Sequence, residues 1–189
     1  GLEKEIFEVY GEKPIIWLKY LDMIIFCVWD AGKEKLNEFL EFMNSFHNTI
    51  KFTMDCSNER INFLDVSLYK KNGKLQTELF CKETDTHQFL HAKSCHRNSY
   101  KKSIPYGQAI RIKRKCSEEQ ILEKNLKDRE EWLIRRGYKS DIVRSEIERV
   151  NAVDRSELLE KRTKTPDDKI TLVLTYHTVL QKIFEILQK

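Results

Sequence analysis

Asp22 is the first residue whose type and position suggest chemistry, because it interrupts the apolar run at residues 15–29. The run is rich in Ile, Trp, Phe and Val, so it predicts two β-strands with Asp22 at the turn between them. A carboxylate at such a turn can bind a divalent cation, but two-metal phosphoryl transfer needs further acidic ligands. The residues alone therefore favour a turn residue and leave a metal ligand as the alternative.

A second candidate site is a cluster of sulfur and imidazole side chains. Spacings of four residues could place three of them on one helix face, where they could bind zinc. The spacing matches no familiar zinc module, so ordinary packing is the favoured alternative. The cluster comprises Cys81, His87, His91, Cys95 and His96.

Basic residues concentrate at residues 86–117, which hold eight Lys or Arg and no Asp or Glu in a chain of net charge +4. Such a segment is typical of a polyanion-binding surface, with a solvated basic face as the alternative. Tyr100 and Tyr106 could lie against sugars or bases. The candidate nucleic-acid-binding residues are Arg97, Lys101, Lys102, Arg111, Lys113, Arg114 and Lys115.

After the first predicted hairpin, the sequence predicts a helix and then further strands. Residues 33–48 have apolar side chains at spacings of three and four, which predicts an amphipathic helix. Residues 50–55 alternate and predict a short strand. Residues 61–69 and 74–81 flank Asn72-Gly73, which predicts a β-hairpin because both turn positions need a positive φ.

From residue 100 onward the pattern becomes helical. Pro105 is expected near a helix start. Ser117 and Gln120 predict a capping box for the next helix, which should end at Gly137. A third helix is predicted at residues 141–161, with four residues facing inward, namely Val143, Ile147, Val150 and Leu158.

The composition excludes several classes of protein. The chain has 189 residues, 40% of them hydrophobic and 34% charged, which is typical of a globular protein and too apolar for a disordered one. No apolar stretch is long enough to span a bilayer, and no secretory signal is seen. The five cysteines are an odd number without a C-x-x-C pair, so we expect reduced thiols in the nucleus or cytoplasm.

The order of strands and helices predicts an α+β fold with a helical second part. We expect three regions. Residues 1–85 hold the two hairpins and one helix, and residues 86–162 form a helical basic region. Residues 163–189 form a linker followed by a short strand and helix.

Several sequence words resemble a known family. The word WLKYLD at residues 17–22, followed by an apolar run, resembles the Tyr-x-Asp-Asp hairpin of reverse transcriptases. The words FLDV at residues 63–66, SIPYGQAIRIKRKCS at 103–117, RRGYKSDIV at 135–143 and LVLTYHTVLQKIFEIL at 172–187 occur in order. Together they resemble the Penelope-like retroelements over nearly the whole chain.

The resemblance implies an RNA-directed DNA polymerase. Residues 1–85 would be a partial palm, in which the hairpin around residues 61–81 holds the primer end, and residues 86–162 would be a thumb that grips an RNA–DNA or DNA duplex. Asp22 would be a catalytic ligand of Mg²⁺ in the intact enzyme. Met23 stands where the family has a second Asp, and the upstream part of the palm is missing from this chain.

These departures imply a fragment that neither polymerises nor binds a metal ion alone but retains a duplex-binding surface. The alternative is a domesticated, non-catalytic domain that binds nucleic acid or a protein partner. A third alternative is a pseudogene product without a selected role.

Overall fold

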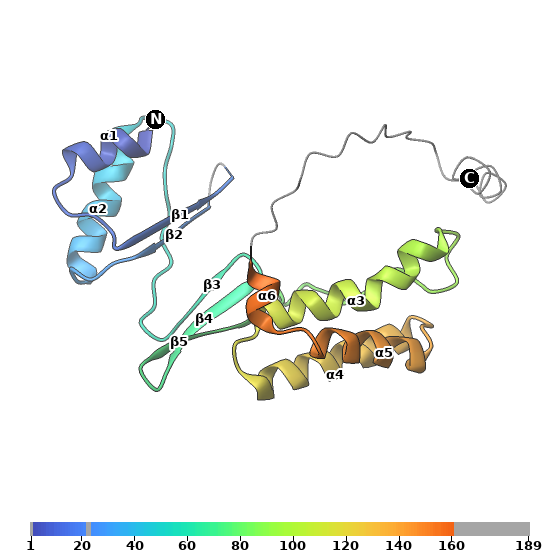
Figure 1. The fold of residues 1–189 in the computed structure, drawn as a ribbon. Helices are drawn as coiled ribbons and strands as arrows, with labels where there is room; N and C mark the ends of the chain where they lie inside the picture. The colour runs from blue at the N-terminus through green and yellow to red at the C-terminus, as the bar shows by residue number, and fades with distance from the viewer. Residues whose placement is uncertain (1, 22–23, 161–189) are drawn as a thin grey trace, which may run out of the picture. The chain divides into compact units, whose positions relative to one another are not determined.

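The computed structural model describes residues 2–21 and 24–160, and it divides into two compact units. We call residues 1–63 the N-terminal unit and residues 64–189 the C-terminal unit. The described residues form six helices and two small antiparallel sheets (Figure 1), which confirms the α+β prediction. The predicted linker, strand and helix after residue 162 lie outside the described residues.

The N-terminal unit contains five elements. Strands β1 and β2 are antiparallel, with Ile16 opposite Val28 and Tyr20 opposite Ile24, so the predicted hairpin is confirmed. Asp22, predicted at its turn, lies outside the described residues. The predicted helix at residues 33–48 is confirmed as α2. The elements are α1 (Leu2–Val9), β1 (Ile16–Tyr20), β2 (Ile24–Val28), α2 (Lys33–Phe46) and β3 (Arg60–Phe63).

Phe39 of α2 is the centre of the core of this unit and is 1% exposed. Its ring stacks on Trp29 at a centroid distance of 5.1 Å and meets the edge of Trp17 at 6.1 Å. Ile6 of α1, a helix that the sequence patterns did not predict, is buried in the same cluster. Aromatic packing around one side chain therefore joins both helices and the hairpin.

The predicted strand at residues 50–55 is wrong, because this segment is irregular. The Asn44 side chain accepts a hydrogen bond from the Phe52 N–H at 2.6 Å and donates one to the Phe52 carbonyl at 3.0 Å. A side chain of α2 thus occupies the backbone groups that strand pairing would have used.

The C-terminal unit begins with a β-hairpin made of β4 (Val66–Lys71) and β5 (Lys74–Leu79). Lys71 pairs with Lys74, and Asn72 and Gly73 have φ values of 51° and 73°, as the predicted turn requires. The predicted continuous strand at residues 61–69 is wrong, because Leu64 has a φ of 57° and a turn interrupts it.

Up to residue 160, four helices follow the hairpin and pack against one another (Figure 1). They are α3 (Asn98–Lys115), α4 (Glu119–Arg135), α5 (Ser140–Asn151) and α6 (Arg155–Leu159). Their buried side chains form two clusters. The first comprises Leu79, Ala109, Ile112, Cys116, Leu122, Leu126 and Val150, and the second comprises Leu133, Tyr138 and Val143.

Two predicted helix boundaries are wrong. The helix that holds Pro105 starts at Asn98, so this residue lies inside α3, where it is buried although a proline there forgoes one backbone hydrogen bond. The predicted helix at residues 141–161 is divided into α5 and α6, because Asp154 caps a new helix by accepting from the Ser156 N–H at 2.7 Å. Val150 and Leu158 are nevertheless buried, as predicted.

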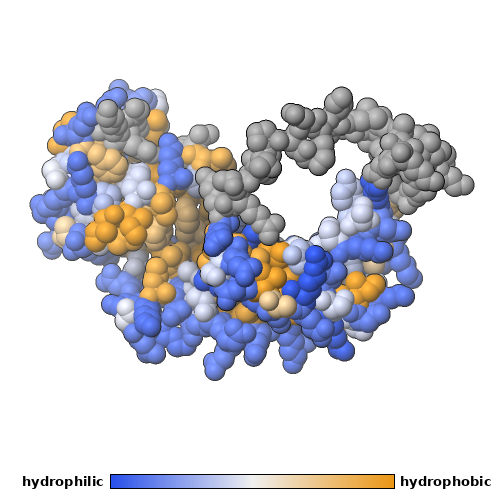
Figure 2. Space-filling view, in the orientation of Figure 1, coloured by the Kyte–Doolittle hydropathy of each residue, from blue (hydrophilic) through white to orange (hydrophobic). Residues whose placement is uncertain are grey.

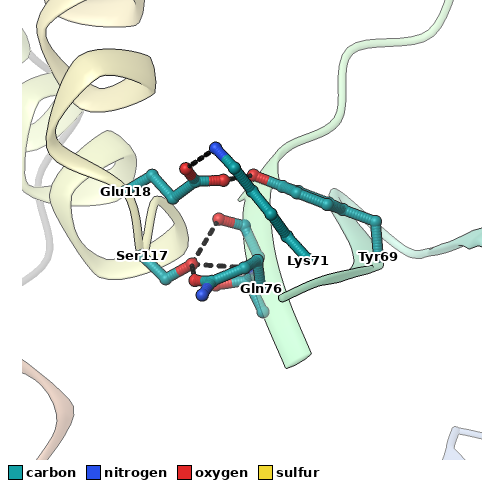
Figure 3. Close-up of polar contacts among 6 residues, drawn as sticks. Tyr69, Lys71, Gln76, Ser117 and Glu118 are labelled. Atoms are coloured by element: carbon teal, nitrogen blue, oxygen red, sulfur yellow. Dashed lines mark hydrogen bonds and ion pairs between the residues drawn. The ribbon is translucent and has the colours of Figure 1, made fainter. Parts of the chain in front are cut away.

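The predicted capping box at Ser117 is also wrong, and the start of α4 is fastened to the hairpin instead (Figure 3). The Ser117 hydroxyl donates to the Gln76 side-chain oxygen at 2.6 Å and accepts from the Thr77 N–H at 2.8 Å. Glu118 accepts hydrogen bonds from Lys71 and Tyr69, which hold the pKa of its carboxyl below the ordinary value. Hydrogen bonds to the hairpin therefore replace the capping hydrogen bonds that were predicted within α4.

Gly137 ends α4 as predicted, with a φ of 84°. Its N–H donates to the Ile134 carbonyl at 2.9 Å, and the Tyr138 N–H donates to the Leu133 carbonyl at 3.2 Å. These two bonds form a Schellman motif, in which a left-handed glycine turns the chain away from the helix. The turn directs the chain into α5.

The surface of the N-terminal unit carries exposed apolar side chains, seen as orange areas in Figure 2. Ile16, Leu18 and Tyr20 alternate along β1 and are 43%, 52% and 48% exposed. These three side chains therefore share one face of the strand.

Candidate nucleic-acid interface

Among the described helices of the C-terminal unit, α3 has the largest excess of positive charge. It contains Lys101, Lys102, Arg111, Lys113, Arg114 and Lys115 and no acidic residue, whereas α4 and α5 mix both signs. The basic segment predicted from the sequence is therefore mainly one helix, and its side chains differ in what they contact.

Lys113 is buried and serves the packing of the helices. Its ammonium group donates to the carbonyl oxygens of Val150 at 3.1 Å and Asn151 at 2.9 Å. These carbonyls belong to the last two residues of α5. The helix dipole places partial negative charge at this end, so a cation there is favourable. This lysine is therefore engaged inside the unit.

Asp65 lies beside the C-terminal half of α3 and pairs with two of its cations. The Arg111 guanidinium donates to one carboxylate oxygen at 3.0 and 3.2 Å, and the Lys115 ammonium contacts the other. Burial acts to raise the pKa of Asp65, but the hydrogen bonds from Lys115 and Arg111 outweigh it and lower that pKa. The left-handed turn at Leu64 precedes this contact, and no sequence pattern signalled it.

A row of exposed residues follows one face of α3. Arg111 and Arg114 are exposed, and Tyr100 is 63% exposed at the other end of the row. A Cβ added at Gly107 would meet nothing within 4 Å, so the helix backbone is open to close approach there. Spacings of three and four place these residues on one side of the helix. We call this row the basic stripe, and it comprises Tyr100, Ser103, Gly107, Arg111 and Arg114.

The remaining basic candidates lie away from this row. Lys101 donates to the Ser94 carbonyl at 3.0 Å, and Arg97 directly precedes α3. Lys102 is exposed, but nine residues, or about two and a half turns, separate it from Arg111, so it points to the opposite side. Arg111 and Lys115 meet at Asp65, and Arg114 lies three residues from Arg111 on the basic stripe.

The predicted helix face with histidine and cysteine residues is not formed, because residues 87–96 are irregular. The His91 ring lies against Gly137, and Cys95 and His96 are exposed. Cys81 and His87 do approach each other, together with Asp85, which the spacing argument had not included.

A small apolar pocket in the N-terminal unit is lined by Trp17, Cys27, Phe39 and Met43, among others. Its volume is about 110 Å³, whereas typical ligand sites have about 300–1,000 Å³. We therefore assign no ligand to it.

In comparison with known families, residues 88–148 match the model of the animal helix-turn-helix domain. The match spans α3, α4 and most of α5, about a third of the chain. No curated protein and no solved structure matches this chain.

This finding overturns the resemblance to the Penelope-like reverse transcriptases, because the family found is a helix-turn-helix domain and not a reverse transcriptase domain. The word at residues 135–143, which contributed to the resemblance, is the end of α4, the Gly137 turn and the start of α5. The assignments of palm, thumb and catalytic Asp22 depended on that resemblance and lose their basis with it.

Within residues 2–21 and 24–160, none of the helices is long and apolar enough to cross a bilayer. The location in the nucleus or cytoplasm stays a prediction.

Proposed function

We propose that the C-terminal unit binds nucleic acid without catalysis and that the basic stripe of α3 lies against the sugar–phosphate backbone. The observation that carries this proposal is a helix with six cations, no acidic residue and one exposed face. The match to a helix-turn-helix domain over the same helices supports it.

The chemistry of the stripe suits a phosphate backbone. Arg111 and Arg114 offer planar guanidinium groups that can donate two hydrogen bonds to one phosphate. Gly107 leaves room for the backbone of a ligand to approach, and the exposed Tyr100 ring can lie on a sugar or a base. Such contacts fix position on the nucleic acid but carry no sequence information.

Helix α5 follows the turn of the motif, at the position where many helix-turn-helix proteins place a recognition helix in the major groove. In this chain we expect α5 to contribute less than α3 to the affinity for nucleic acid. Arg144 pairs with Glu130 at 2.6 Å, and Arg149 pairs with Glu146 at 3.4 Å. With Asp141 and Glu148 also exposed, this helix offers little net attraction to phosphate.

The test is a titration of duplex DNA and of an RNA–DNA hybrid at several salt concentrations. Each phosphate contact contributes about 0.9 to the slope of log K against log salt. The double variant Arg111→Gln and Arg114→Gln should therefore reduce the slope by about 1.8 for every sequence alike. Lys115 remains in place, so Asp65 keeps a partner.

The matched control is Lys124→Gln with Lys127→Gln, which removes the same charge from exposed positions of α4. It should keep the slope. A wild-type protein without salt-dependent binding, or equal losses in both double variants, would contradict the proposal. The alternative of protein binding, for which the exposed apolar face of β1 is the observation, would then be preferred.

A further inference from the structure

A second group of chemically active side chains lies between β5 and α3, apart from the basic stripe. The sulfur of Cys81, a carboxylate oxygen of Asp85 and a ring nitrogen of His87 all lie within 4.8 Å of one another. Thiolate, carboxylate and imidazole are the three ligand types that zinc uses in proteins. We propose that Cys81, Asp85 and His87 bind a divalent transition-metal ion of the zinc class.

The segment holds Asp85 and His87 in fixed positions. The Asp85 N–H donates to the Lys82 carbonyl at 2.9 Å, and one Asp85 carboxylate oxygen accepts from the His87 N–H at 2.8 Å. His87 has a φ of 52°, and its ring stacks on Trp132 at 3.7 Å with an interplanar angle of 8°. A left-handed backbone and a stacked ring together orient the imidazole toward the carboxylate.

The His87 ring supplies an observation that points to a ligand. Its Nδ1 atom is buried and has no hydrogen-bond partner among the described residues. It lies 3.4 Å from the second carboxylate oxygen of Asp85, too poorly aligned for a hydrogen bond. A cation between these two atoms would satisfy both, because each would offer it a lone pair.

The distances fit a tetrahedral ion after a small movement. Zinc bonds of about 2.0–2.3 Å place tetrahedral ligand atoms about 3.3–3.8 Å apart. The pair formed by Asp85 and His87, at 3.4 Å, already fits. Closing the remaining separations, which reach at most 4.8 Å, needs about 1 Å of movement, within reach of a rotation of the Cys81 side chain.

Three protein ligands leave a fourth position for water or an external donor. The thiolate favours zinc and cobalt over magnesium and calcium, which prefer oxygen ligands. On binding, the Cys81 thiol releases its proton to solvent and forms the metal–sulfur bond as a thiolate.

Arg129 lies next to the site and sets a limit on affinity. It is 4% exposed, and its guanidinium carbon lies 4.8 Å from the ring centre of Phe89 and 4.9 Å from that of Trp132. Burial lowers the pKa of this guanidinium, and the neighbouring Cys81 and Asp85 act in the opposite direction. Its charge repels a metal ion, but thiolate and carboxylate together neutralise a divalent ion, and an N–H of Arg129 can donate to the bound sulfur.

The experiment is a titration of the full chain with Co²⁺ under reducing conditions. One equivalent should produce the near-ultraviolet charge-transfer band of a cobalt–thiolate bond, and Zn²⁺ should remove it by displacement. The band should vanish in Cys81→Ser. Asp85→Asn should weaken binding by more than the about 10- to 100-fold that loss of a supporting hydrogen bond costs.

Cys95→Ser is the matched control, because Cys95 is an exposed cysteine in the same segment and should leave the band unchanged. A wild-type chain without the band would overturn the proposal and leave an imidazole–carboxylate ion pair in its place. Retention of the full band in Cys81→Ser would overturn it equally. The wild-type spectrum decides the first outcome without a variant, so a folding defect in a variant cannot mask it.

Discussion

The carboxylate of Asp65 supplies to two cations of α3 the negative charge that a phosphate group would supply. It binds Arg111 and Lys115, two of the cations that the C-terminal half of α3 would direct toward a nucleic-acid backbone. An exposed ion pair of this kind contributes only about 0–1 kcal/mol to stability. Its larger effect is to compete with nucleic acid for the two cations.

We therefore expect Asp65→Asn to strengthen nucleic-acid binding. Arg111 already counts among the contacts of the wild type, so the added contact is that of Lys115, and the slope of log K against log salt should become steeper by up to about 0.9. Fluorescence titrations at three salt concentrations measure it. An unchanged slope and affinity would mean that the Asp65 ion pairs do not compete with nucleic acid.

The lowered pKa of Asp65 also predicts a pH dependence of stability. Its carboxyl binds a proton more weakly in the folded than in the unfolded state, whose value is about 3.9. The stabilisation is therefore present above pH of about 4 and is lost as pH falls through the folded pKa. The free energy of unfolding, measured against pH, should fall in this acidic range by a smaller amount in Asp65→Asn.

At the scale of the elements, specific groups satisfy the C-terminal ends of two helices, α4 and α5. The Schellman motif at Gly137 ends α4, and Lys113 of α3 closes the last carbonyls of α5. The Gly137 turn leads from α4 into α5, and the Lys113 bonds attach the C-terminal end of α5 to α3. Each end gives a stability prediction.

Gly137→Ala should destabilise the C-terminal unit by about 1–2 kcal/mol, because a φ of 84° is costly for a residue with a Cβ. The added Cβ would also lie 3.3 Å from the His91 ring. The control is Gly107→Ala in the open interior of α3, which should stabilise by about 0.5–1 kcal/mol. Urea unfolding of both variants measures the difference, and equal effects would refute the assignment of the Gly137 turn.

Lys113→Met should cost about 1.5–3 kcal/mol of stability, because two hydrogen bonds from a charged donor are lost. The Val150 carbonyl keeps its hydrogen bond from the Val153 N–H at 3.1 Å. Lys102→Met removes the same charge from an exposed position of α3 and should change stability by less than about 0.5 kcal/mol. Thermal unfolding of the pair decides whether Lys113 closes α5. A small loss in both variants would show that it does not.

At the scale of the whole molecule, the chain consists of two units with separate cores. The N-terminal core is built around Phe39, whereas the basic stripe, Asp65 and the proposed metal ligands all belong to the C-terminal unit. A unit with its own core can fold independently.

We accordingly expect a fragment of residues 64–189 to retain the salt-dependent binding of the full chain. The fragment should unfold cooperatively and keep the same slope of log K against log salt, while residues 1–63 alone should show none. Circular dichroism and the same titrations provide the measurement. A folded fragment that has lost most of the slope would assign the interface to residues outside the C-terminal unit.

The features that could be predicted from the sequence are those that neighbouring residues determine. Asn72-Gly73 specifies a tight turn by its backbone preferences, Gly137 specifies a helix end, and the spacing of apolar residues specifies α2. The clustering of positive charge on α3 follows from composition and helical spacing alone. Each of these depends on contacts within a few residues.

Only the tertiary structure decided what those features contact. Hydrogen bonds between the Asn44 side chain and Phe52 replace the strand pairing predicted at residues 50–55. Ser117 forms hydrogen bonds to β5 instead of capping α4. Lys113 is buried, and Asp65 accepts a hydrogen bond from Arg111, which lies 46 residues away in the sequence. Asp85 joins Cys81 and His87 through a left-handed turn that no spacing rule predicts. Side chains from distant segments compete with local preferences for the same donors and acceptors, and that competition is resolved only when the chain packs.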